Sequence, residues 1–229
     1  MIIARSFLNK TVAVMGLARS GKAAIESLVL GGARVLAWDD DPKRREEISG
    51  VGVEIRDLHA INFKDIDALV LSPGIPHSFP KPHPVAAKAK TSGVPIIGDI
   101  DIFAQNSRNT PVIGVTGTNG KSTTASLIGH LLSHSNISNE VAGNIGRPVL
   151  EISLDPGPDF LVLELSSYQL ELSPSLGCNI AVLLNITPDH LDRHGGMDGY
   201  VRAKRQIFDK LSYDAKTVSY THLTLPTRS

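Results

Sequence analysis

The stretch that decides the fold reads Val112-Ile-Gly-Val-Thr-Gly-Thr-Asn-Gly-Lys-Ser-Thr123. Its apolar first half predicts a buried strand, which runs into a glycine-containing loop and then into the start of a helix. Such a loop directs several backbone N–H groups at one point, and the helix adds the positive end of its dipole. These properties predict a site for the phosphates of ATP. We assign it to Gly117, Thr118, Asn119, Gly120, Lys121, Ser122, Thr123 and Thr124.

Lys121 and the two hydroxyls after it carry the chemistry of this loop. Lys121 supplies a mobile positive charge for the outer phosphates, and Ser122 or Thr123 can offer an oxygen to Mg²⁺. The stretch is shorter than the strict Walker pattern, because Val115 stands where that pattern has its first glycine. The alternative interpretation is a strand-to-helix turn that binds no ligand, but Gly-Lys-Ser-Thr directly after a buried strand favours the phosphate site.

The composition is that of a folded protein with one large or two ordinary domains. The chain has 229 residues, 41% of them hydrophobic, and its 23 Lys and Arg balance its 23 Asp and Glu. This balance lacks the positive charge typical of nucleic-acid binding. Cys178 is the only cysteine, and no apolar run has the length of a membrane span. With no secretory signal sequence, we expect a cytoplasmic protein with no nucleic-acid partner and no membrane insertion.

Strands and helices alternate along the chain in two α/β units, which predicts parallel sheets covered on both faces. Buried strands are predicted at residues 11–15, 34–38, 68–71, 94–97, 112–116, 160–163 and 180–184. A polar stretch at 107–111 predicts a boundary between a first domain at 1–107 and a second at 108–217. The helix after the phosphate loop is expected to bury a stripe of Leu127, Ile128, Leu131 and Leu132. Residues 218–229 lack this rhythm, and we interpret them as a non-native tail.

Two further polar groups follow buried strands of the second unit. In open α/β sheets, ligands bind beyond the carboxyl ends of the strands. Glu164 comes directly after one of these strands and residues 185–190 follow another. A carboxylate beside a phosphate loop is well placed to bind Mg²⁺, although Glu164 could instead cap a helix or form a salt bridge. His190 and His194 have the i, i+4 spacing of a zinc helix, but the glutamate of that motif is absent, so the spacing gives little support for zinc.

The first unit contains a loop of a related kind. Gly16-Leu-Ala-Arg-Ser-Gly21 follows a predicted strand, and Asp39 stands near the usual place of a ribose-binding acid. Ala18 replaces the middle glycine, which normally lets the backbone approach a pyrophosphate, so a nicotinamide cofactor is disfavoured. A nucleoside diphosphate held by the loop, Arg19 and Ser20 is one interpretation, and a turn without a ligand is the other.

Taken together, these motifs resemble the ATP-dependent Mur ligases of peptidoglycan synthesis. The segments that carry the resemblance occur in the order of that family, at residues 16–21, 72–76, 98–103, 117–123, 143–146, 163–171, 189–195 and 200–204. The segments Ser72-Pro-Gly-Ile-Pro76 and Leu163-Glu-Leu-Ser-Ser-Tyr-Gln-Leu-Glu171 are most similar to those of the members that add D-glutamate.

The resemblance implies a fold and a substrate site. The fold would be a Rossmann-like, parallel-sheet domain that binds the UDP part of the substrate, followed by an incomplete P-loop-type α/β domain that binds ATP. Residues Arg19, Ser20, Asp39 and Gly74 would hold the uridine diphosphate. Asn144 would contact the muramoyl group.

The resemblance also implies catalytic and metal-binding residues. Lys121 would bind the ATP phosphates, and Mg²⁺ would be held by Ser122 or Thr123 together with Glu164. His190 would hold a second Mg²⁺. Lys204 stands where family members carry a carbamylated lysine. A carbamate would turn this cation into an anionic oxygen ligand, and its formation requires the neutral amine.

The implied activity is the ATP-dependent addition of D-glutamate to UDP-N-acetylmuramoyl-L-alanine through an acyl phosphate, a step of cell-wall synthesis and so of cell shape and division. The substrates are small molecules, and a monomer is expected for the full-length protein. Family members have three domains and this chain ends within the second, so we expect that it does not complete the ligation alone. The alternatives are another Mur-type amino-acid ligase, a folylpolyglutamate synthase, or a non-catalytic nucleotide-binding fragment.

Overall fold

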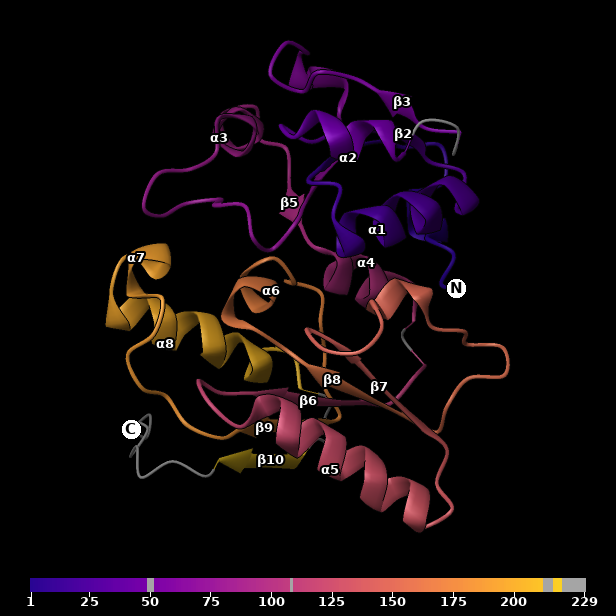
Figure 1. The fold of residues 1–229 in the computed structure, drawn as a ribbon, viewed down its shortest axis with the longest axis vertical. Helices are drawn as coiled ribbons and strands as arrows, with labels where there is room; N and C mark the ends of the chain where they lie inside the picture. The colour runs from indigo at the N-terminus through magenta and orange to yellow at the C-terminus, as the bar shows by residue number, and fades with distance from the viewer. Residues whose placement is uncertain (49–51, 108, 212–215, 220–229) are drawn as a thin grey trace.

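The computed structural model describes residues 1–48, 52–107, 109–211 and 216–219. These residues form two α/β units that lie one above the other in Figure 1, the first coloured from indigo to magenta and the second from pink to yellow. Each unit is built on a five-stranded sheet with parallel strand pairs. The predicted α/β class with parallel sheets is therefore confirmed. None of the described helices has both the length and the apolar character that a bilayer span requires.

The first sheet has the strand order β3-β2-β1-β4-β5. Its strands are β1 (Thr11–Met15), β2 (Arg34–Trp38), β3 (Glu54–Ile55), β4 (Ala68–Leu71) and β5 (Ile96–Ile97). The helices are α1 (Arg19–Leu30), α2 (Pro42–Glu46), α3 (Pro84–Thr91) and α4 (Asp99–Asn106), with 3-10 turns η1 (Arg5–Phe7) and η2 (Phe63–Asp65). The order of the strands reverses at β1, whose neighbours are β2 and β4. Such a switch point is where open sheets bind ligands.

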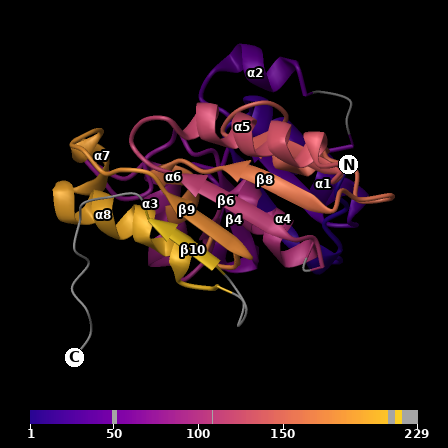
Figure 2. The ribbon, with the colours of Figure 1, turned by 90° about the horizontal axis from the view of Figure 1, so that it is seen from below.

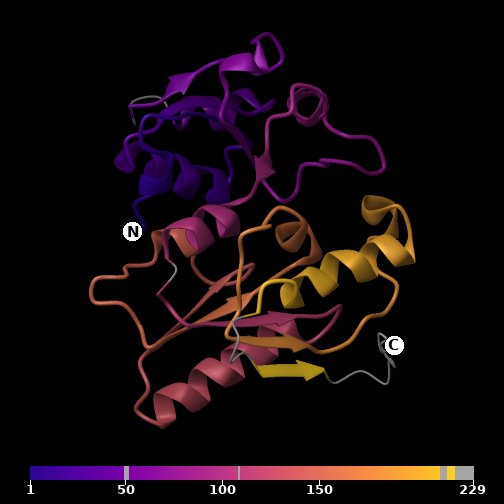
Figure 3. The same cartoon turned by 180° about the vertical axis from the view of Figure 1, so that it is seen from behind.

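The second sheet has the strand order β10-β9-β6-β8-β7. Its strands are β6 (Val112–Thr116), β7 (Asn139–Gly143), β8 (Phe160–Glu164), β9 (Ile180–Leu183) and β10 (Lys216–Ser219). The helices are α5 (Lys121–His134), α6 (Ser167–Glu171), α7 (Leu191–His194) and α8 (Met197–Arg205), with 3-10 turns η3 (Val149–Glu151) and η4 (Gln206–Phe208). In Figures 2 and 3, α5 lies on one side of this sheet and α8 on the other.

The central strand of the second sheet uses its alternating residues to build two packed faces. Ile113 and Val115 belong to the cluster that includes residues of α5. Val112 belongs to the larger cluster on the opposite face. Gly114 lies on that face too, where a Cβ would come 2.6 Å from the sulfur of Cys178. Close packing on both faces fixes the strand that leads into the phosphate loop.

Helix α5 buries a narrower face than its leucine pattern predicted. Ile128 and Leu132 pack against the second sheet, but Leu127 and Leu131 are more than half exposed. The helix approaches the sheet so closely that a Cβ at Gly129 would lie 2.5 Å from a methyl carbon of β7. Contact through this glycine turns the helix, so the expectation that all four residues are buried is wrong for Leu127 and Leu131.

Of residues 218–229, which we interpreted as a non-native tail, the structure describes Val218 and Ser219. Val218 and Ser219 end β10, which pairs in parallel with β9 through Val218 and Val182. Residues 220–229 lie outside the described residues. Sequence analysis did not predict this strand, because its pairing partner is more than 30 residues away and strand formation depends on such partners.

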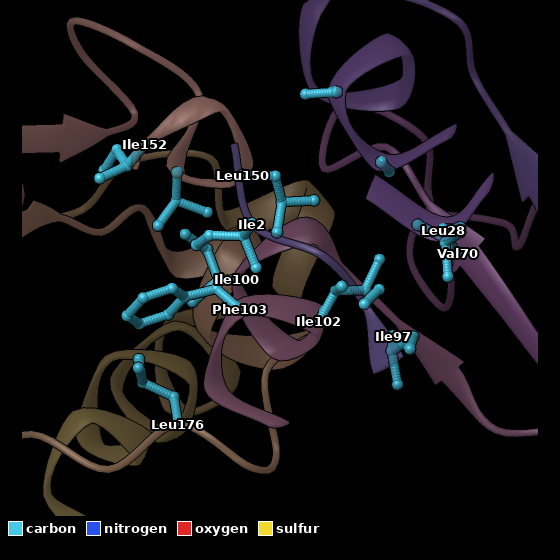
Figure 4. Packing of buried hydrophobic residues seen from close by; sticks show 14 of the residues in the cluster. Ile2, Leu28, Val70, Ile97, Ile100, Ile102, Phe103, Leu150, Ile152 and Leu176 are labelled. Carbon is cyan, nitrogen blue, oxygen red and sulfur yellow. The ribbon is translucent and has the colours of Figure 1, made fainter. Parts of the chain in front are cut away.

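One hydrophobic cluster extends through both units. Figure 4 shows Ile100 and Phe103 of α4 beside Leu150 and Leu176 of the second unit, and the same cluster includes Leu28 of the first. Full burial of one such side chain stabilises the fold by about 1.5–3 kcal/mol. The hydrophobic core is therefore continuous where the chain passes from the first sheet to the second near residue 107. This shared core holds the two units against each other.

Candidate functional site

The phosphate loop lies between β6 and α5, where the sequence placed it. Gly120 directly precedes the helix with a φ of 82°, a left-handed conformation that favours glycine. The amine of Lys121 folds back and donates to the carbonyl of Thr118 at 2.8 Å. Within the described residues, no acceptor is recorded for the N–H groups of Gly120, Lys121 and Ser122. These groups at the start of α5 are available to an anion.

Two other N–H groups of the loop are already used by Asn185, which follows β9. The side-chain oxygen of Asn185 accepts from Thr118 at 3.1 Å and from Asn119 at 2.9 Å, and its amide nitrogen donates to the carbonyl of Asn119 at 3.0 Å. The backbone N–H groups of Thr118 and Asn119 therefore hold the loop to Asn185. Sequence reasoning placed Asn185 at this edge but did not assign it this role.

Lys204 reaches the same loop from α8. Its side chain is fully buried, and its amine donates to the carbonyl of Gly117 at 2.7 Å. Burial lowers the pKa of this amine to about 7, and the nearby charge of Lys121 acts in the same direction. The amine also lies 4.7 Å from the ring centre of Tyr200, whose hydroxyl is 3.0 Å from that of Thr118. The amine of Lys204, like that of Lys121, thus lies against the phosphate loop.

Glu164 ends β8, and its neighbour across the sheet is Val115 of β6. The side chain is 1% exposed, and one carboxylate oxygen accepts from the amide of Asn144 at 2.8 Å. The other oxygen is buried and has no hydrogen-bond partner among the described residues. Among the residues that the structure describes, this carboxylate neither caps a helix nor forms a salt bridge. A buried, unpaired carboxylate oxygen is costly, and a hard cation such as Mg²⁺ would satisfy it.

The two histidines of α7 have different surroundings. His190 precedes the helix with a φ of 48°, and its side chain is 57% exposed. His194 is buried, and its two ring nitrogens lie 2.9 Å from the hydroxyl of Ser167 and 3.1 Å from the carboxylate of Glu171. Because both nitrogens of His194 have partners in the protein, this spacing does not form a zinc pair. Nε2 of His190 lies 3.5 Å from the carboxylate of Asp189, and its exposed ring can still be reached by a ligand.

Glu171 joins the two units. Its second oxygen lies 3.1 Å from Nε2 of His77, which comes from the loop between β4 and α3. Burial raises the pKa of Glu171, but the hydrogen bonds with His194 and His77 outweigh it and hold the pKa at about 2, below the usual 4.5. The folded protein therefore favours the ionised carboxylate.

We predict that this carboxylate makes the fold sensitive to acid. A group with a lowered pKa stabilises the fold fully above pH 4.5, and its contribution is lost as the pH falls towards 2. Allowing for partial screening, roughly 2 kcal/mol of unfolding free energy should be lost in this window, and Glu171→Gln should remove this part of the pH dependence. Urea unfolding at a series of pH values measures it, with the exposed Glu26→Gln as control. Parallel pH curves for parent and Glu171→Gln would contradict the prediction.

A pocket of about 290 Å³ lies between the two units. Arg19 and Ser20 of the first unit and Asn144 of the second line it, so three of the predicted substrate-binding residues are brought together. The guanidinium of Arg19 also donates to the carbonyl of Gly146 at 2.8 Å, which closes one side of the pocket across the junction. Asn144 connects the pocket to the second unit's strand ends through its hydrogen bond to Glu164.

The other two predicted substrate residues are placed differently. The carboxylate of Asp39 is buried and accepts from the backbone N–H of Leu17 at 2.7 Å and of Asp41 at 2.9 Å. It therefore holds the glycine loop of the first unit. The carbonyl of Gly74 accepts from Arg193 at 3.1 Å. Neither Asp39 nor Gly74 lines the pocket between the units.

Asp99 also lines this pocket, and sequence analysis assigned it no role. Its side chain is buried, one carboxylate oxygen has no partner among the described residues, and burial raises its pKa to about 6. Asp99 follows β5 at the carboxyl edge of the first sheet. The strand-end rule that selected Glu164 could also have selected Asp99.

A larger cavity of about 360 Å³ lies elsewhere, beside Val112 and Asn179. These residues stand where β6 and β9 begin. Because parallel sheets bind ligands at the opposite, carboxyl end of their strands, we assign the functional site to the smaller pocket and the adjoining phosphate loop.

Comparisons with known proteins concern the family and the fold. Residues 115–222 match the family described as the Mur ligase middle domain. A UDP-N-acetylmuramoylalanine--D-glutamate ligase of Caulobacter vibrioides (strain NA1000 / CB15N) is 50% identical over 214 residues, which are 91% of this chain and 45% of that protein. The ligase of the same name from Rhodospirillum rubrum is 50% identical over 207 residues, 88% of this chain and 43% of that protein.

Solved structures support the fold. A UDP-N-acetylmuramate:L-alanyl-gamma-D-glutamyl-meso-diaminopimelate ligase from Neisseria meningitides matches with a TM-score of 0.58 and 17% identity, covering 94% of this chain and 72% of that chain. At this identity the likeness concerns the fold alone. The chain spans less than half the length of the two curated relatives.

Proposed function

Since residues 115–222 match the Mur ligase middle domain, we propose that the chain is part of an ATP-dependent ligase that adds D-glutamate to UDP-N-acetylmuramoyl-L-alanine. The substrates follow the names of the relatives that are 50% identical to it. Because the chain spans less than half of those relatives, the complete reaction is proposed for a polypeptide of their length that contains this sequence. Such an enzyme would act in the cytoplasm, where ATP is present, as a monomer on small-molecule substrates.

The proposed reaction has two steps. The alanyl carboxylate attacks the γ-phosphorus of ATP, which forms an acyl phosphate and releases ADP. The amine of D-glutamate then attacks the acyl carbon, loses a proton, and phosphate leaves from the tetrahedral intermediate. The free N–H groups at the start of α5 and the amine of Lys121 would hold the γ-phosphate and neutralise the charge that builds on it.

The observation that carries this proposal is the unpaired oxygen of Glu164 beside the phosphate loop. The donor set at this edge fits Mg²⁺, which is an oxygen-preferring ion and would supply positive charge to the ATP phosphates. Glu164 with the hydroxyl of Ser122 or Thr123 would hold one ion, and His190 would hold a second.

Lys204 would add an oxygen ligand after carbamylation. In that reaction the neutral amine attacks the carbon of CO₂, a N–C bond forms and one proton leaves, so an anionic carbamate replaces the cation. The lowered pKa of this buried amine supports the proposal, because the neutral form is then abundant near neutral pH.

We predict that Glu164→Gln separates metal binding from folding. The amide can keep the hydrogen bond with Asn144 while the unpaired buried charge is removed, so the melting temperature should stay the same or rise. The factor by which Mg²⁺ increases the affinity for ATP should then be about ten times smaller in the variant than in the parent. Calorimetric titration with and without Mg²⁺ measures this, with the exposed Glu26→Gln as control. Unchanged Mg²⁺ dependence in Glu164→Gln would remove this carboxylate from the metal site.

The reaction itself is tested with a polypeptide of the relatives' length. Incubated with ATP, UDP-N-acetylmuramoyl-L-alanine and hydroxylamine but no D-glutamate, it should form a hydroxamate from the trapped acyl phosphate. Formation of hydroxamate only when the alanyl substrate is present would support the proposal. ATP binding without any hydroxamate would favour a non-catalytic nucleotide-binding role.

A further inference from the structure

Three side chains that can bind a metal ion converge on the first unit, outside the site described above. They are Asp40, which follows β2, His59, which lies in the turn after β3, and His83, which directly precedes α3. Their ligand atoms all lie within 4.8 Å of one another. In the part of the chain that the structure describes, no other group of three or more His, Cys, Asp or Glu side chains brings its ligand atoms this close together.

The carboxylate of Asp40 lies between the two imidazoles. One of its oxygens is 3.0 Å from Nε2 of His59, and the other is 3.0 Å from Nε2 of His83. The indole N–H of Trp38 donates to the same carboxylate at 3.2 Å. Both rings thus point the same nitrogen at one carboxylate, which brings three ligand atoms close together.

We propose that Asp40, His59 and His83 bind one divalent transition-metal ion, with Zn²⁺ as the reference. Two imidazoles and one carboxylate suit Zn²⁺, Co²⁺ or Cu²⁺, whereas Mg²⁺ prefers sites in which most ligands are oxygen atoms. Three protein ligands leave at least one coordination position open to water or to an oxygen of a ligand bound at this edge of the first sheet. The site is therefore separate in place and chemistry from the oxygen site at Glu164.

The protein holds two of the three ligands in place through their backbones. The backbone N–H of His59 donates to Asp57 at 2.9 Å, and its carbonyl accepts from the amine of Lys88 at 2.9 Å. The backbone N–H of His83 donates to the carbonyl of Pro76 at 2.9 Å. Ligands that are already positioned lose less conformational freedom when the ion binds.

Metal binding requires a change of proton position in both rings. A neutral imidazole that binds through Nε2 carries its proton on Nδ1. In His83, Nδ1 accepts a long hydrogen bond of 3.3 Å from the N–H of Val85, so this helix cap is lost when the ion binds. For Nδ1 of His59 no partner is recorded among the described residues, so its proton can move without a similar loss.

The only tryptophan of the chain makes the site directly measurable. Because Trp38 donates to Asp40, a paramagnetic ion such as Co²⁺ bound there should quench its fluorescence. The chain is first freed of metal with a chelator and then titrated with CoCl₂. We expect saturable quenching at one ion per chain, and recovery of the fluorescence when ZnCl₂ displaces the cobalt.

Single substitutions decide whether these residues bind the ion. His59→Gln and His83→Gln should each weaken cobalt binding about 10- to 100-fold, as loss of groups at a metal site does. His134→Gln is the matched control, because His130 and His134 lie one turn apart on α5 with ring centres 6.4 Å apart and can chelate metal themselves. It should leave the quenching of Trp38 unchanged.

Quenching that does not saturate, or that is the same in His59→Gln as in the parent, would overturn the proposal. His59 is in an exposed turn and caps no helix, so this variant tests the site even if the loss of the His83 cap disturbs α3. If the three side chains form only a surface hydrogen-bond network, quenching should rise with the cobalt concentration without saturating.

Discussion

Replacing Lys121 with alanine is expected to lower the affinity of the chain for ATP about 10- to 100-fold. The amine of Lys121 donates to the carbonyl of Thr118 within the loop, and its flexible side chain can turn from there to a phosphate oxygen. Hydrogen bonds to charged groups contribute about 1.5–3 kcal/mol each, and alanine removes both the charge and the donors. The free N–H groups at the start of α5 would remain, so weak binding should persist.

Calorimetric titration of the chain with ATP and Mg²⁺ measures this loss. Lys64→Ala is the matched control, because Lys64 is an exposed lysine of the first unit, far along the chain from the phosphate loop. The affinity should fall for Lys121→Ala alone. Equal affinity in Lys121→Ala and parent would show that the loop does not hold the outer phosphates, and would remove the basis of the proposed function.

Replacing Gly21 with alanine is expected to destabilise the protein by about 3 kcal/mol, at the upper end of what overpacking costs. A Cβ at Gly21 would lie 1.9 Å from the carbonyl oxygen of Gly16. That oxygen accepts a hydrogen bond from the hydroxyl of Ser72, and the N–H of Gly16 donates to Trp38 at 2.9 Å. Since the glycine loop is fixed on both sides, α1 would have to move away from the first sheet.

Urea unfolding followed by circular dichroism measures this change. Gly74→Ala is the control, because a Cβ at Gly74 meets no atom within 4 Å and its backbone is not left-handed. The unfolding midpoint should fall strongly for Gly21→Ala and little for Gly74→Ala. A midpoint for Gly21→Ala near that of the parent would show that α1 and the loop can separate without loss of packing.

The sequence predicted the parts of the fold that are encoded locally. The strands β1, β2, β4, β6, β8 and β9 are mostly apolar, and each lies within one or two residues of its predicted bounds. The phosphate loop was visible because its glycines, lysine and hydroxyls are adjacent in the chain. Leu127 and Leu131 misled the prediction for α5, because hydrophobicity alone does not show that Gly129 takes the contact with the sheet.

The sequence predicted the candidate site only where a general rule of sheet architecture applies to residues that are far apart in the chain. The carboxyl-edge rule brought Glu164 next to the phosphate loop, and the same rule would have found Asp99. The role of Asn185 in occupying two N–H groups of the loop depends on side-chain positions across 66 residues of chain. Asp39 has the sequence position of a ligand-binding acid, yet its carboxylate is used to hold Leu17.

The pocket at the junction is lined by residues of both units. Binding of a molecule in this pocket is therefore coupled to the relative orientation of the two units. Arg19 reaches Gly146, Arg193 reaches Gly74, and His77 meets Glu171 across the same junction. A molecule that touches both walls binds the closed arrangement more tightly than an opened one, so it shifts the population towards closure by its difference in affinity. By reciprocity, any substitution that loosens these three cross-junction contacts weakens binding in the pocket, even when it leaves every pocket residue in place.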